Sequence, residues 1–187
     1  IHRFHIAKNA RIKYVEKHYG EGTGTGENVL NPVTEIFMDE NSYCEMEIVQ
    51  IKGVDSTKRN TNAKLEKGAR LVVLEKLMTH GSQFAETEFT VDLDGENSGA
   101  NVISRSVAKG NSYQDYHSVI KGNCRCTGHS ACDAILAGNG RVNATPELYA
   151  GDLDASLIHE AAIGKIAGEQ LIKLRTLGLT AEEAEQK

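Results

Sequence analysis

The stretch GARLVVLEKLMTHGSQFAETEFTVDLDG, residues 68–95, carries the pattern that decides the fold of this chain. It contains two apolar-rich runs, 70–77 and 87–93, separated by polar residues and glycine. Alternation of apolar and polar residues with a period of two is typical of a strand with one buried face. The stretch therefore predicts two short strands joined by polar turns.

The same rhythm continues on both sides of this stretch. The turns at Asn41, Gly68 and Gly95 lie 27 residues apart (68 − 41 and 95 − 68). Further strands are predicted over residues 45–51, 102–108, 113–120, 134–137 and 147–150. A stack of coils with two or more short strands per coil would produce this repeat. A sandwich of hairpins, the commoner all-β fold, explains the same turns, because Asp-Gly and Asn-Gly also close hairpins. Periodicity alone leaves both folds open.

The N-terminal part of the chain leads into this repeat. Residues 1–20 alternate in a way that suits an entering pair of strands, and the glycine-rich segment 20–28 has neither a phosphate-loop nor a dinucleotide-binding spacing. We therefore interpret 1–33 as entering strands and a flexible connector at the start of a β domain that extends to residue 163. Because residue 1 is not Met, we expect the natural N-terminus to lie outside this sequence.

The C-terminal part changes from strand to helix periodicity. Apolar residues between Ile166 and Leu177 recur at helical spacing, and Gly178 stands where a left-handed helix cap belongs. Thr180 and Glu183 form a capping box that starts a second helix. We therefore predict a helical segment over 164–187, with helices at 166–178 and 180–187.

Composition and charge exclude several classes of protein. A chain of 187 residues fits one domain, and its net charge of −5 comes with scattered Lys and Arg, so neither nucleic acid nor an anionic membrane is a predicted partner. No apolar run approaches the roughly 20 residues that span a bilayer, and the opening residues lack the apolar core of a signal peptide. We therefore predict a cytoplasmic protein.

Four potential soft-metal ligands lie close together in the sequence: Cys124, Cys126, His129 and Cys132. Thiolate and imidazole suit zinc or the iron of iron-sulfur clusters. The spacing differs from that of common zinc knuckles, however, and on a strand His129 would face away from the three cysteines. A zinc-stabilised module is one hypothesis, and small buried hydrophobic cysteines are the plainer interpretation.

His159 and Glu160 form a second candidate pair at the end of an apolar run. Neighbouring residues on a strand point to opposite faces, so only one of the two would share a site with a given cysteine. The simpler interpretation is that His159 is a partly buried histidine without a ligand function and that Glu160 is a carboxylate favoured near a helix N-terminus. The sequence contains no nucleophile triad, paired catalytic carboxylates or Walker motif, so we do not predict an enzyme.

Several separate blocks resemble one known family, the SufB/SufD proteins. The blocks are HSACDAIL (129–136), PEL (146–148), LIHEAAIGKI (157–166), EQL (169–171) and Gly178-Leu179. SufB and SufD are scaffold subunits of the iron-sulfur cluster assembly machinery. The resemblance implies a short member with a right-handed parallel β-helix followed by a short helical region.

The resemblance also implies roles for individual residues. Cys132 matches a cysteine that accepts sulfur or ligates iron, Glu160 matches a glutamate that acts as an oxygen ligand or base, and His159 lies at the position of a histidine ligand. Cys124 and Cys126 match no residue that we can assign. Because 160 − 132 = 28 residues is about one coil of the repeat, we expect Cys132 and Glu160 to lie close together.

Partners follow from the same resemblance. The family works as homodimers or heterodimers joined through the β-helix, and its terminal helices dock a SufC-like ABC-type ATPase. Residues 166–178 and 180–187 are the matching elements, although Ile172-Lys173 replaces the Phe-Tyr pair that commonly follows Gln-Leu. Three hypotheses result: a non-enzymatic scaffold for a transient iron-sulfur cluster, a β-solenoid that dimerises without a cluster, and a zinc-stabilised module.

Overall fold

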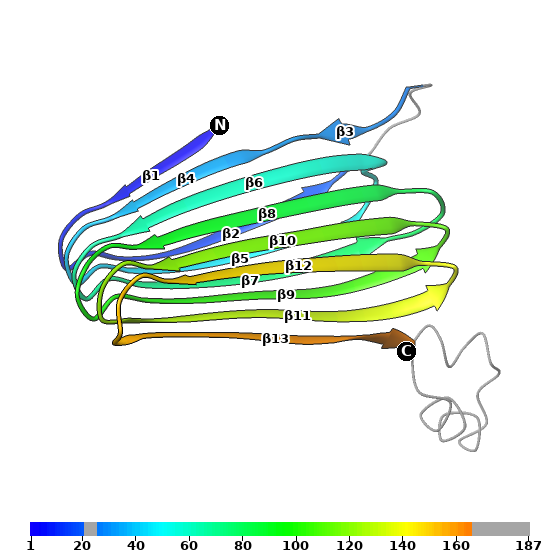
Figure 1. Cartoon of the computed structure of the whole chain (residues 1–187). Coiled ribbons are helices and arrows are strands. Elements are labelled where there is room, and N and C mark those ends of the chain that lie inside the picture. Colours follow the sequence, from blue (N-terminus) through cyan, green and yellow to red (C-terminus); the bar gives the residue numbers. More distant parts are fainter. Residues whose placement is uncertain (21–25, 166–187) are drawn as a thin grey trace, which may run out of the picture.

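A computed structural model describes residues 1–20 and 26–165, which form a parallel β-solenoid of about six turns (Figure 1). All regular elements in these ranges are strands, and every pairing between them is parallel. Parallel pairing rules out the sandwich of hairpins, in which consecutive strands would pair antiparallel. The described residues include no helix that could span a membrane.

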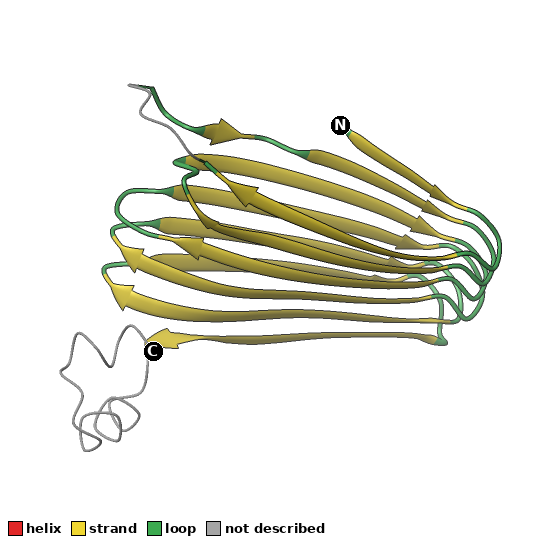
Figure 2. Ribbon diagram, turned by 180° about the vertical axis from the view of Figure 1, so that it is seen from behind, coloured by secondary structure: helices red, strands yellow, loops and turns green. Residues whose placement is uncertain are grey.

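The strands form two sheets that face each other. The first sheet contains, in order, β1 (His2–Ile6), β4 (Val33–Met38), β6 (Ser56–Leu65), β8 (Phe84–Leu93), β10 (Tyr113–Gly122) and β12 (Arg141–Ala150), with the short β3 (Val29–Leu30) beside β6. The second sheet contains, in order, β2 (Arg11–Tyr19), β5 (Tyr43–Lys52), β7 (Arg70–Thr79), β9 (Gly99–Gly110), β11 (Cys126–Gly138) and β13 (Ala155–Lys165). Apart from β3 and β4, which both pair with β6, the chain alternates between the sheets, so that each turn contributes a strand to each (Figure 2).

Register follows the repeat seen in the sequence. Ser56 on β6 pairs with Phe84 on β8, which pairs with Tyr113 on β10, so successive turns are 28 and 29 residues long (84 − 56 and 113 − 84). The turns are tight where coils stack, and Gly68 adopts a left-handed φ of 66° at one of the predicted turns. The prediction of stacked coils is confirmed.

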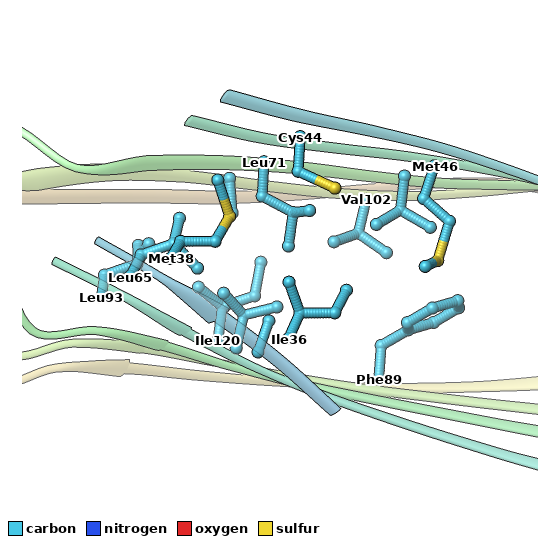
Figure 3. Packing of buried hydrophobic residues seen from close by; sticks show 14 of the residues in the cluster. Ile36, Met38, Cys44, Met46, Leu65, Leu71, Phe89, Leu93, Val102 and Ile120 are labelled. Atoms are coloured by element: carbon cyan, nitrogen blue, oxygen red, sulfur yellow. The ribbon is translucent and has the colours of Figure 1, made fainter. Parts of the chain in front are cut away.

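The core lies between the two sheets along the whole solenoid. Apolar side chains from the first sheet meet those from the second, as Figure 3 shows for Ile36 and Phe89 on one side and Met46 and Leu71 on the other. All four side chains are about 1% exposed. Inward positions alternate with outward positions along each strand, which explains the period of two in the sequence.

Some predicted boundaries differ from the structure. Residues 1–20 do form two strands, but β1 and β2 belong to different sheets and do not pair with each other. β13 continues through Lys165, beyond the predicted start of the helical segment at 164. Most of the predicted connector and both predicted helices, within 21–25 and 166–187, lie outside the described residues.

β6 is a strand that the sequence pattern did not predict. Three of its inward positions are Thr57, Arg59 and Thr61, which are buried although they are polar. A pattern search for apolar residues at alternate positions therefore finds nothing in this run. Two of these polar side chains have partners: Thr57 Oγ1 donates to the carbonyl oxygen of Leu30 at 2.5 Å, and Arg59 contacts Glu16 and His18. The hydroxyl of Thr61 is buried without a hydrogen-bond partner among the described residues.

Candidate functional site

Cys132 lies on β11 with its side chain in the interior between the sheets. The positions paired with it on the neighbouring strands are Ser104 on β9 and Ala161 on β13. The residue is 1% exposed, and burial, together with the charges of Glu75 and Asp133, raises the pKa of its thiol to about 11. In this conformation Cys132 is therefore a protonated thiol at neutral pH.

His159 faces the same interior from β13, one turn further along the solenoid. It pairs with Ser130 on β11, diagonally across from Cys132, which ordinary sheet spacing places about 8 Å away between backbone positions. Both imidazole nitrogens are buried and have no hydrogen-bond partner among the described residues. Burial lowers the pKa of His159, as does the nearby His129, whereas Glu160 opposes the shift. The neutral imidazole is the form that ligates metals.

Hydroxyl groups line the interior next to these two residues. Ser130 Oγ lies 2.8 Å from Ser118 Oγ and 3.3 Å from the Tyr116 hydroxyl. All three residues are buried, and Ser118 and Tyr116 come from β10 in the opposite sheet. Hydroxyl groups from both sheets therefore meet in this part of the interior, next to apolar residues of the same turns such as Ile120 and Cys126.

A buried charged cluster continues this polar interior toward the N-terminal turns. Arg59 Nη1 lies 3.3 Å from Glu16 Oε1, Arg59 Nε lies 3.6 Å from Glu75 Oε1, and Arg59 Nη2 lies 2.8 Å from His18 Nδ1. Burial alone would raise the pKa of Glu16, but the hydrogen bond from His18 and the charge of Arg59 outweigh it and lower the pKa to about 2. Ser104 donates to Glu75 Oε2 at 2.8 Å, which links the cluster to the position beside Cys132.

Glu160 lies on the outer face of the second sheet, not in the interior. It pairs with Ala131, and its side chain is 72% exposed. Its Oε2 lies 3.6 Å from Nε2 of His129, whose Nδ1 lies 2.8 Å from Asn101 Oδ1. The expected juxtaposition of Cys132 and Glu160 is therefore wrong for this structure: one coil is 29 residues long here (161 − 132), so the partner of Cys132 is the next residue, on the opposite face.

The four potential zinc ligands do not converge. Cys126 and Cys132 face the interior but lie six positions apart on β11, about 20 Å, whereas His129 faces outward, as the strand reading predicted. Cys124 lies in the loop before β11, where its thiol contacts the carbonyl oxygen of Leu93 at 3.5 Å. Among the described residues, no three His, Cys, Asp or Glu side chains are arranged to hold a metal ion. The closed zinc site is not supported.

Sequence reasoning missed the polar interior. Arg59 and Tyr116 lie in no recognised motif, and Ser130 lies in the block HSACDAIL without an assigned function. The available signal was only their position, at inward sites of strands. A buried charge is expected to be paired, so an Arg on the inward phase of a strand could have pointed to acidic partners elsewhere in the chain.

Comparisons with known proteins identify a family for this chain. The family described as "SUF system FeS cluster assembly, SufBD core domain" matches residues 2–142 and, in a second overlapping match, residues 65–186. Two archaeal proteins named as iron-sulfur cluster assembly SufBD family proteins are each 29% identical: that of Archaeoglobus fulgidus over 185 residues (98% of this chain, 49% of the relative) and that of Methanocaldococcus jannaschii over 181 residues (96% and 57%). A protein of the same description from Galdieria sulphuraria is 32% identical over 111 residues, 57% of this chain and 50% of the relative. The chain thus spans about half the length of these relatives.

Proposed function

The chain belongs to the SufBD core-domain family of iron-sulfur cluster assembly proteins, and from that premise we propose that it is a non-enzymatic scaffold that holds a nascent cluster as its cargo. The observation that carries the proposal is the shared interior of the last two turns. Cys132 and His159 both face it from adjacent strands. A thiolate and an imidazole are ligands that iron-sulfur centres accept.

The protonation states of the two residues suit a transient function. His159 is ready to ligate, because burial favours its neutral form. Cys132 has a thiol pKa of about 11, so it must lose its proton when sulfur or iron arrives. A thiol that must first lose its proton binds iron more weakly than a thiolate that is already formed. Weak binding of the cluster is what its later transfer to another protein requires.

Further ligands must come from outside these two residues, since a cluster needs more than two. We propose that a second subunit, either another copy or a SufB/SufD relative, packs against the last turn. In support, β12 and β13 each have only one neighbouring strand among the described residues, and Leu148, Tyr149 and Ile158 are exposed there. Glu160 with His129 on the outer face is a second ligand pair that such a partner could complete.

We also propose a cytoplasmic location and a SufC-like ABC-type ATPase as partner, docked through residues 166–187. The support is the helical spacing of apolar residues in that segment and the block Glu169-Gln170-Leu171. A pull-down with the ATPase subunit tests the assignment: binding lost on deletion of 166–187 supports it, and binding that survives the deletion contradicts it.

Anaerobic reconstitution with ferrous iron and sulfide tests the scaffold function. We expect the wild-type protein to take up both, with charge-transfer absorbance in the visible range, and Cys132→Ala to lose most of this uptake. Cys44→Ala is the matched control, because Cys44 is an inward thiol of the same sheet that is 2% exposed. Absence of uptake in the wild type, or equal uptake in Cys132→Ala, would contradict the proposal.

A further inference from the structure

A groove of about 500 Å³ lies on the second sheet near the end of the described chain. Its apolar lining includes Val107 on β9, Ile135 on β11 and Ala162 on β13, and Arg105 and Asp133 flank it. The two flanking residues form an ion pair with 3.8 Å between Nε and Oδ2, so the rim is polar while the floor is apolar. Ile135 is 42% exposed, so its side chain is accessible from the groove.

The groove continues at Gly164, which has no side chain. Val107, Ile135 and Gly164 occupy one row across β9, β11 and β13, at outward positions. A Cβ at Gly164 would meet no other atom within 4 Å among the described residues. The row therefore has two apolar side chains and then open space at the last strand, which leaves room for a side chain from another segment.

The chain itself supplies a segment of the right chemistry at this place. β13 ends at Lys165, on the side where the carboxyl ends of β9 and β11 also lie (Figure 1). The segment 166–178 follows directly and carries apolar residues at helical spacing, the chief ones being Ile166, Ala167, Leu171, Leu174 and Leu177.

Dimensions and charge are compatible with docking. A helix of about 13 residues is roughly 20 Å long, and three adjacent strands span about 10 Å, so it can cross the row from Val107 to Gly164. The segment carries one acidic residue, Glu169, and one basic residue, Lys173. Each charge at the rim of the groove, Arg105 or Asp133, therefore has a residue of opposite charge in the segment. A tether that begins three residues after Ala162 also gives the segment a local concentration of order mM or higher at the groove.

We propose that the segment 166–178 docks its apolar face into the groove lined by Val107, Ile135 and Ala162. The contact would fix the C-terminal segment on the outer face of the second sheet and leave its polar face free. The inference does not rest on cluster binding or on an ATPase partner, since the groove and the segment are both parts of this chain.

Hydrogen exchange of the full chain, followed by mass spectrometry, tests the proposal. We expect backbone amides of 169–178 to exchange at least about ten-fold more slowly than unstructured peptide does. Ile135→Asp should remove this protection by placing a charge in the groove. Val15→Asp is the matched control: Val15 is also exposed and outward on the second sheet, on β2, but it does not line the groove, so protection should remain.

Two further outcomes separate the docked segment from its rivals. Gly164→Leu should fill the hollow and also release the segment, without loss of the cooperative unfolding transition, because its side chain would enter open space. Exchange of 169–178 at the unstructured rate in the wild type, or protection that survives both Ile135→Asp and Gly164→Leu, would overturn the proposal. If dilution dissociates a dimer and the protection of 169–178 disappears with it, the groove binds a second copy of the chain. That result would equally overturn the proposal.

Discussion

Cys132 and Glu160 lie on neighbouring strands of one sheet and face opposite sides of it. Cys132 points into the solenoid beside Ala161, whereas Glu160 points outward beside His129. The displacement is a single residue of register, and on a strand that is enough to move a side chain to the other face. The potential ligand on β13 that shares the interior with Cys132 is therefore His159, which pairs with Ser130 and lies diagonally across from Cys132. Glu160 and His129 form a separate pair on the outer face.

The accessibility of the four thiols provides the first prediction. Cys124 lies in a loop and is partly exposed, whereas Cys44, Cys126 and Cys132 are buried. Burial raises the thiol pKa of both Cys124 and Cys132 to about 11, so accessibility separates the two. In the folded protein we expect iodoacetamide to modify Cys124 first and Cys132 at least about a hundred-fold more slowly, because Cys132 is only 1% exposed. Peptide mass mapping over time measures this order, and rapid modification of Cys132 in the native state would contradict it.

The second prediction concerns the buried cation. Arg59→Met leaves the buried carboxylates of Glu16 and Glu75 without their guanidinium partner, which should reduce the free energy of unfolding by about 3–5 kcal/mol. Arg105→Met removes an exposed ion pair with Asp133 and should change it by about 1 kcal/mol or less. Urea unfolding measures the free energy of unfolding of both variants. Equal losses would show that the buried cluster stabilises the protein no more than the exposed ion pair does.

The third prediction is a dependence of stability on pH. The folded-state pKa of Glu16 is lowered from 4.5 to about 2, so its contribution is fully present above pH 4.5 and is lost as the pH falls toward 2. The full shift corresponds to roughly 3 kcal/mol. Glu16→Gln should be less stable than wild type at pH 6 but lose less stability on acidification. If the free energy of unfolding falls equally with pH in wild type and Glu16→Gln, the contribution assigned to Glu16 would be contradicted.

The fourth prediction uses two glycines. A Cβ at Gly95 would lie 1.9 Å from the backbone nitrogen of Lys67 in the adjacent turn, whereas a Cβ at Gly164 would meet nothing within 4 Å. Gly95→Ala should therefore push two stacked turns apart and cost about 1–3 kcal/mol of unfolding free energy, or more. Gly164→Ala should be neutral or slightly stabilising. Thermal unfolding of both variants checks the contrast, and a tolerated Gly95→Ala would argue against such close stacking.

The sequence predicted much of this fold because apolar residues recur with period two and turns recur at nearly constant spacing. Choosing between stacked coils and a sandwich needed the family resemblance, since strand pairing is a long-range property that local patterns do not contain. β6 was missed because Thr57, Arg59 and Thr61 occupy inward positions that patterns expect to be apolar.

The site was predicted less completely than the fold. Cys132 and His159 were identified by resemblance, and the structure places both in the interior of the last turns. The proximity of Glu160 was wrong because a coil length estimated to within one residue still leaves the face of a strand undetermined. The hydroxyl groups of Tyr116 and Ser130 became visible only when the opposite sheets were brought together.

Because His159 and Glu160 are adjacent in sequence but face opposite sides, they offer the most direct test of the scaffold function. Iron and sulfide uptake should be measured after anaerobic reconstitution of His159→Gln and Glu160→Gln, at matched protein concentration. If the interior of the last turns holds the cluster, His159→Gln loses most of the uptake and Glu160→Gln keeps most of it. Full uptake by His159→Gln, with loss in Glu160→Gln, would place the cargo on the outer face and contradict this account.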